Sequence, residues 1–219
     1  MAKETVQIVE NILNANDQIA EENRSYFDSR GITALNIMAS PGAGKTSVIL
    51  KTIELLGSEI KMAVIEGDTA PVTIDADKIS GANIPVIQIN TSGACHLDAI
   101  MIRKGIGQMN LDGISLIVIE NVGNLVCPAA FDLGAHSNVV IASLPEGDDK
   151  PYKYPNIYRG IDCLLLNKID LQPYLNFDMA YFQKGIEALN PGAEVFPLSA
   201  KTGEGFDRWI SWLKEKIAN

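Results

Sequence analysis

The chain has 219 residues, 47% of them hydrophobic and 21% charged, which suits one α/β domain with a sizeable buried core. Its formal net charge of −9 argues against general binding to nucleic acid or to anionic membranes, because both partners select a basic face. Three cysteines do not make a disulfide framework, and neither a signal peptide nor an apolar run of roughly 18 residues is evident, so we expect a cytoplasmic protein.

The N-terminal stretch predicts one long helix. Over residues 4–28, apolar side chains recur at three- and four-residue steps with acids and asparagines between them, and Gly31 can cap the resulting helix. We therefore expect a helical extension over residues 1–30 and a single larger domain over residues 31–219.

Short apolar segments then alternate with helical patterns. The apolar segments are bounded by turn residues, as strands covered on both faces are, and lie at residues 34–38, 61–65, 84–89, 114–119, 138–143, 163–167 and 194–199. Helical patterns fit between most of them, at residues 45–56, 96–109, 174–189 and 204–217. This order predicts an α/β fold with a mainly parallel sheet and helices on both faces. The segment 145–160, rich in Pro, Gly, Asp and Lys, is interpreted as a mobile connection or a docking surface.

The stretch A-S-P-G-A-G-K-T-S at residues 39–47 carries the first chemical motif. It matches the phosphate-loop pattern G-x-x-x-x-G-K-S/T except at Ala39, and a plain glycine-rich turn is the alternative interpretation. Backbone N–H groups of the loop would close round phosphate oxygens, while Lys45 would neutralise the β- and γ-phosphates and Thr46 would hold Mg²⁺. The predicted phosphate-binding residues are Gly42, Ala43, Gly44, Lys45, Thr46 and Ser47.

The string N-K-I-D at residues 167–170 selects the base. The Asp170 carboxylate can accept hydrogen bonds from both N1–H and the 2-amino group of guanine, a donor pair that adenine lacks. The Ala200 N–H, in the later string P-L-S-A-K, is a candidate to contact guanine O6. These motifs favour a GTPase over an ATPase or a small-molecule kinase, and the predicted guanine-binding residues are Asn167, Lys168, Asp170, Ser199, Ala200 and Lys201.

Two further strand ends carry acids, in E-G-D at residues 66–68 and in I-E-N-V-G at residues 119–123. Carboxyl ends of parallel strands meet at one edge of a sheet, so Asp68 and Glu120 are candidates for Mg²⁺. Gly123 would offer its N–H to the γ-phosphate and lose that contact on hydrolysis. Asp75 is a candidate for orienting the attacking water, with a solvated turn acid as the alternative. The predicted catalytic residues are Lys45, Asp75, Glu120 and Gly123.

The cysteines suggest a second kind of site. Cys95 and His96 stand at the start of the helix predicted over residues 96–109, whose N-terminus would lower the pKa of Cys95, and Cys127 follows the strand 114–119. Two thiolates and an imidazole suit Zn²⁺, Ni²⁺ or Cu, although most cysteines in reduced proteins are small buried hydrophobes. Cys163, inside the apolar C-L-L-L, is interpreted as a core cysteine. Two chains related by a twofold axis would supply four sulfurs, enough for a tetrahedral site.

Together these motifs resemble the HypB family of hydrogenase nickel-incorporation GTPases, within the class of P-loop metallochaperone GTPases. The resemblance covers nearly the whole chain and rests above all on C-H-L-D-A and E-N-V-G-N-L-V-C-P, beside S-P-G-A-G-K-T, E-G-D, F-D-L-G, E-G-D-D-K-P and N-K-I-D. It implies a three-layer P-loop NTPase fold. It also implies an enzyme that hydrolyses GTP to GDP and phosphate and inserts nickel during NiFe-hydrogenase maturation.

The resemblance further implies how the site would work. Cys95, His96 and Cys127 would hold Ni²⁺ or Zn²⁺ at the interface of a GTP-dependent homodimer. The turn that senses the γ-phosphate, at Gly123, would continue along the chain to the metal ligand Cys127. The implied partners are a HypA-type nickel carrier and the hydrogenase large-subunit precursor, with no nucleic acid and no membrane. The alternatives are an accessory GTPase for urease or a cobalamin enzyme, and a metal-binding protein stabilised by a fixed nucleotide.

Overall fold

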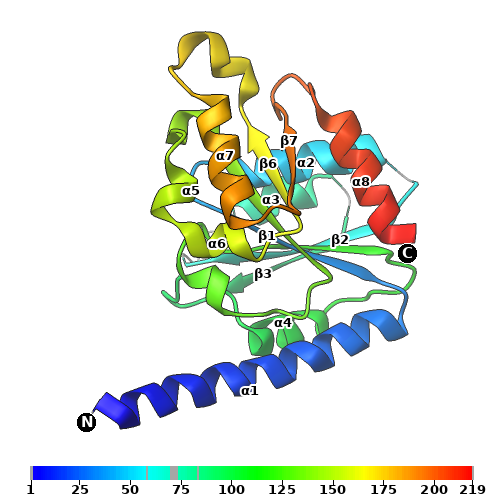
Figure 1. Cartoon of the computed structure of the whole chain (residues 1–219). Coiled ribbons are helices and arrows are strands. Elements are labelled where there is room, and N and C mark those ends of the chain that lie inside the picture. The colour runs from blue at the N-terminus through cyan, green and yellow to red at the C-terminus, as the bar shows by residue number, and fades with distance from the viewer. Residues whose placement is uncertain (1, 58, 70–73, 83, 219) are drawn as a thin grey trace.

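The computed structural model describes residues 2–57, 59–69, 74–82 and 84–218, with no account of the side chains of residues 2–11, 74 and 75. A seven-stranded sheet with the order β3-β2-β4-β1-β5-β6-β7 forms its middle layer (Figure 1). The strands are β1 (Thr33–Ala39), β2 (Met62–Asp68), β3 (Val86–Asn90), β4 (Leu116–Glu120), β5 (Ser137–Ser143), β6 (Cys163–Asn167) and β7 (Glu194–Pro197). Every neighbouring pair is parallel, which confirms the predicted strands and the predicted sheet.

Helices cover both faces of the sheet, because successive residues of each strand bury apolar side chains on opposite sides. On β1, Leu35 and Ile37 pack towards one face, and Ala34 and Met38 pack towards the other. The helices are α1 (Ala2–Ser29), α2 (Lys45–Leu56), α3 (Ile74–Ser80), α4 (Ala99–Ile106), α5 (Lys150–Lys153), α6 (Pro155–Arg159), α7 (Met179–Leu189) and α8 (Phe206–Ala218). Three 3₁₀ turns complete the chain: η1 (Cys127–Ala130), η2 (Leu144–Glu146) and η3 (Ile169–Tyr174).

The long N-terminal helix is confirmed, and it lies along α4 on one face of the molecule (Figure 1). It ends at Ser29, and Gly31, which has a φ of 63°, closes the turn that follows, where the Gly31 and Ile32 N–H groups donate to the Asp28 and Phe27 carbonyls. Phe27 is fully buried in the core between α1, α4 and the sheet. The division of the chain at residues 30 and 31 stays a prediction.

Local contacts shift two of the predicted helices. The helix predicted from residue 96 begins at Ala99, because the Asp98 side chain caps it by accepting the Met101 N–H at 2.7 Å. The helix predicted from residue 174 begins at Met179 for the same reason, with Asp178 as its cap.

Two other segments contain helices that the sequence did not predict. The seven-residue helix α3 had no predicted counterpart. The segment 145–160 contains the short helices α5 and α6, and α6 buries Ile157 and Tyr158 against the sheet and α7. Its interpretation as a mobile connection or a docking surface stays a prediction. None of the helices in the described part of the chain has the length and apolarity needed to cross a membrane.

Candidate nucleotide and metal site

The loop between β1 and α2 has the shape of an anion cradle. Gly42 and Gly44 have φ values of 78° and 100°, which favour glycine. A Cβ on Gly44 would also come within 2.5 Å of the Asn167 Nδ2. Helix α2 starts at Lys45 with no side-chain cap and no acid in its first turn, so its first N–H groups remain available to a phosphate.

Carboxylates gather beside this loop at the ends of β2 and β4. The Thr46 hydroxyl donates to Glu120 Oε1 at 3.0 Å, and Glu120 is the register partner of Glu66 on the adjacent strand. Both glutamates are buried, so together they favour a cation nearby. Glu66 was not among the residues predicted from the sequence, although an acid that opens E-G-D at the end of an apolar strand is a visible signal. The residues present therefore fit Mg²⁺.

One cavity of about 400 Å³ joins these groups to the first cysteine. Its lining includes Lys45, Glu66, Asp68, Cys95, Glu120 and Gly123. Gly123 lies hard against the phosphate loop, because a Cβ there would come within 3.2 Å of both Lys45 Nζ and Pro41 Cα. Asp75 lies in α3, but its side chain is outside the described residues, so its proposed role stays a prediction.

The strings predicted to bind guanine are joined to the phosphate loop by hydrogen bonds. Asn167 donates from Nδ2 to the Ala43 carbonyl at 2.9 Å and accepts the Ala200 N–H at 3.1 Å. Lys168 donates from Nζ to the Gly42 carbonyl at 2.7 Å. The Ala200 N–H thus already has a partner, which weakens its predicted contact with guanine O6.

Asp170 is oriented by a buried hydroxyl. The Ser199 Oγ donates to Asp170 Oδ1 at 2.6 Å and itself accepts the Thr202 N–H at 3.2 Å. Lys201, which follows in the same turn, is exposed. The carboxylate that would read guanine is therefore held by side-chain contacts already present in the protein.

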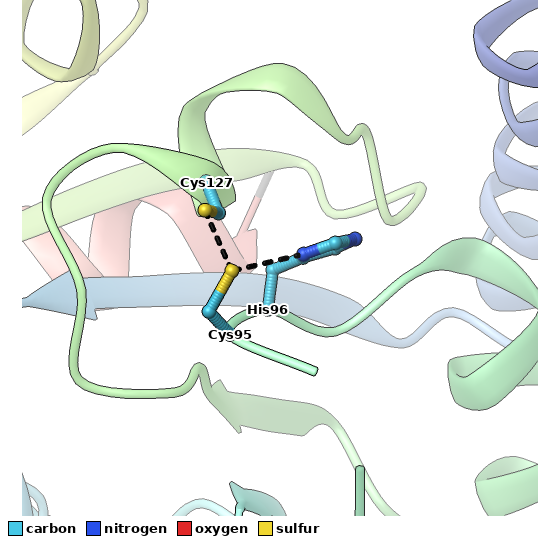
Figure 2. A group of neighbouring side chains, drawn as sticks. All are labelled: Cys95, His96 and Cys127. Atoms are coloured by element: carbon cyan, nitrogen blue, oxygen red, sulfur yellow. Dashed lines mark hydrogen bonds between the residues drawn. The ribbon is translucent and has the colours of Figure 1, made fainter. Parts of the chain in front are cut away.

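Cys95, His96 and Cys127 form a compact donor cluster (Figure 2). Their candidate ligand atoms all lie within 4.8 Å of one another, with the sulfurs of the two free thiols 2.6 Å apart. The His96 ring stacks on Phe131 at a centroid distance of 3.9 Å, a contact that the sequence did not reveal. Two sulfurs and an imidazole fit a soft divalent ion.

The protonation states of this cluster follow from burial and from neighbouring groups. Burial lowers the pKa of His96, opposed by Asp98, so the imidazole is neutral near pH 7, the form that binds metals. The hydrogen bond with Cys127 raises the pKa of Cys95, and burial adds to this. The predicted lowering by a helix N-terminus is therefore wrong, because α4 begins four residues later, at Ala99.

The third cysteine does not belong to the cluster. Cys163 lies on β6 and is fully buried in the core, where burial raises its pKa well above the usual range. The prediction of a core cysteine is confirmed.

The parallel sheet, the glycine loop and the acids at the strand ends define a P-loop nucleotide-binding protein with a Cys/His cluster beside its phosphate site. A family model described as "CobW/HypB/UreG, nucleotide-binding domain" matches residues 33–197. The chain belongs to this family, and within it to the HypB group.

Individual relatives agree with this assignment. The hydrogenase maturation factor HypB of Azotobacter chroococcum mcd 1 is 47% identical over 96% of this chain and 69% of its own length. The crystal structure of HypB from Helicobacter pylori in complex with nickel matches with a TM-score of 0.89 at 35% identity, covering 93% of this chain and 95% of that one. HypB from Archaeoglobus fulgidus matches with a TM-score of 0.87 at 37% identity, covering 94% and 100%. These matches confirm the predicted family and the P-loop NTPase fold.

Proposed function

We propose that this chain is a GTPase that hydrolyses GTP to GDP and phosphate and uses that cycle to control nickel delivery during NiFe-hydrogenase maturation. The observation that carries the proposal is the cavity shared by Lys45, Glu120 and Gly123 on its phosphate side and by Cys95 on its metal side. The similarity to a HypB crystallised with nickel supports nickel as the cargo.

The nucleotide is held at its two ends. Lys45 and the N–H groups at the start of α2 bind the phosphates, and Asp170, oriented by Ser199, accepts from guanine. Mg²⁺ held by Thr46, Glu120 and Asp68 would supply positive charge to the phosphates. Phosphoryl transfer goes to water, and intrinsic turnover is slow, on the order of 10⁻⁴ s⁻¹, as in GTPases without an arginine finger.

The metal ligands respond to the nucleotide because one segment of the chain joins the γ-phosphate site to Cys127. Gly123 donates its N–H to the γ-phosphate, and loss of that phosphate releases the turn that leads to Cys127. Cys95, His96 and Cys127 give one chain three ligands, so a second chain completes the ligand set in the GTP-bound homodimer. A HypA-type nickel carrier and the hydrogenase large-subunit precursor are the proposed partners on either side of this step.

Two measurements on the full chain test this function: phosphate release from GTP, and Ni²⁺ affinity by competition with a chromophoric chelator. Cys127→Ala removes a ligand and should lower Ni²⁺ affinity by about 10- to 100-fold or more. Loss of a residue that only supports a metal ligand already lowers metal affinity by that amount. Cys163→Ala, which removes a core sulfur, is the matched control and should leave Ni²⁺ affinity unchanged. Absence of phosphate release, or equal Ni²⁺ affinity in both variants, would refute the proposal.

A further inference from the structure

One side-chain amide joins the two segments that carry the sulfur ligands. Asn124, which directly follows Gly123, donates from Nδ2 to the Cys95 carbonyl at 3.2 Å. Its Oδ1 accepts the N–H of Val126 at 2.9 Å, one residue before Cys127. The Asn124 amide therefore links the backbone of Cys95 to the backbone of Val126, the residue before Cys127.

A second amide fixes the frame around this bridge. Asn121 is fully buried and accepts the N–H groups of Leu97 and Val122 at 3.1 and 2.9 Å. It donates to Asn36 Oδ1 on β1 at 3.1 Å, and Asn36 in turn donates to Asn138 Oδ1 on β5 at 2.9 Å. Leu97, which directly follows Cys95 and His96, is thus linked to the sheet through Asn121 and Asn36.

The two asparagines differ in their freedom to move. Asn121 is held by β1, whose Ile37 carbonyl also accepts its backbone N–H at 2.9 Å. Asn124 is only half-buried and follows Gly123, which lies so close to the phosphate loop that an added Cβ would come within 3.2 Å of Lys45 Nζ and Pro41 Cα. A displacement of Gly123 would therefore act first on Asn124 and on its bond to the Cys95 carbonyl, whereas Asn121 is held by the sheet.

We propose that Asn124 is a positioning residue that converts a displacement of Gly123 into a change in the spacing of the Cys95 and Cys127 sulfurs. This inference rests on the proposed function, since it names the residue through which nucleotide state reaches the metal ligands. Without the Asn124 amide, the nucleotide and the metal still bind, but each loses its influence on the other.

The test measures Ni²⁺ affinity of the full chain by chelator competition, with Mg²⁺ and either GDP or a non-hydrolysable GTP analogue. Asn124→Asp keeps an acceptor for the Val126 N–H and removes the donor to the Cys95 carbonyl. Asn124→Ala removes both bonds without adding charge. Asn110→Asp is the matched control, because the exposed Asn110 caps only its own turn by accepting the Asp112 N–H at 3.0 Å.

We expect the wild-type affinities in the two nucleotide states to differ by about 5- to 150-fold, the usual range of allosteric coupling. Both Asn124 variants should reduce that ratio by roughly 2- to 30-fold, while Asn110→Asp keeps it. Binding of a fluorescent GDP and thermal unfolding establish that each variant is folded.

Two outcomes overturn the proposal while leaving the proposed function intact. One is that both Asn124 variants keep the wild-type Ni²⁺ affinities in both nucleotide states, and with them the wild-type ratio. The other is an equal loss of Ni²⁺ affinity in both nucleotide states, since that would make the amide a structural part of the site alone. Equal wild-type affinities with GDP and with the analogue would instead refute the nucleotide-controlled metal site itself, and this inference with it.

Discussion

At the residue scale, the three cysteines occupy two chemical environments. Cys95 and Cys127 are partly exposed, whereas Cys163 is fully buried and burial raises its pKa well above the usual range. Alkylation needs access to the sulfur as well as a thiolate, so in the metal-free native protein iodoacetamide should modify the partly exposed Cys95 and Cys127 and leave Cys163 intact until the protein unfolds. The reaction of Cys95 should be slow, because the hydrogen bond with Cys127 raises its pKa. Peptide mass spectrometry of a labelling time course checks this.

Metal provides the control for that labelling experiment. Added Ni²⁺ or Zn²⁺ should protect Cys95 and Cys127 together, because both sulfurs would then be ligands. Rapid native labelling of Cys163, or protection of one cluster cysteine without the other, would contradict the environments that the structure assigns.

A glycine of the phosphate loop gives a second prediction at this scale. Gly44→Ala places a Cβ at a φ of 100° and 2.5 Å from Asn167 Nδ2, which disturbs the bond between the phosphate loop and the base-selecting loop. Strain of about 1–3 kcal/mol lowers GDP affinity by roughly 5- to 150-fold in a fluorescence titration. Gly57→Ala is the control: its φ is 55°, but nothing lies within 4 Å of the new Cβ, so GDP affinity should hold.

At the scale of helices and strands, the apolar segments predicted the sheet well because parallel strands are buried on both faces. Helix α3 escaped prediction because it is short and shows only Ala76 and Ile79 buried among its described side chains, too few to display a helical period. The segment 145–160 is polar on average, so its composition did not predict that Ile157 and Tyr158 are buried. Their burial depends on contacts with α7, a helix distant in sequence.

The docking of α1 depends on one glycine. At Gly134, with a φ of 81°, a Cβ would overlap the Ala20 carbonyl oxygen and lie 2.8 Å from the Asn23 Cβ. Gly134→Ala should therefore push α1 away, and strain plus overpacking should reduce the free energy of unfolding by about 2–5 kcal/mol in urea. Gly160→Ala, where nothing lies within 4 Å of the new Cβ, is the control. Equal stability of the two variants would show that α1 tolerates displacement.

At the scale of the whole molecule, the sequence predicted which residue types serve the site better than it predicted how they are connected. Lys45, Glu120 and Cys95 each belong to a local string, and the structure places them round one cavity. Asn124 belongs to such a string too, but its bond to the Cys95 carbonyl spans 29 positions. Only the packed fold shows such a link, because strand order decides which loops become neighbours.

The proposed homodimer gives the last prediction. Val126 is an exposed apolar side chain, 61% accessible, beside the partly exposed Cys127, so a twofold contact through the metal cluster would bring two copies of Val126 close together. Val126→Glu would then place like charges in that contact, which costs several kcal/mol, and the dimer dissociation constant should rise at least about 10-fold.

Sedimentation velocity with Mg²⁺, Ni²⁺ and a non-hydrolysable GTP analogue measures this, with GDP as the reference state. Tyr174→Glu adds the same charge at a side chain that is 82% exposed on η3, and it should leave the dimer intact. If both variants dimerise like the wild type, the contact does not run through the Cys127 turn. The metal cluster would then have to complete its ligand set with water or with a carrier protein, and nucleotide state would act on the metal within a single chain.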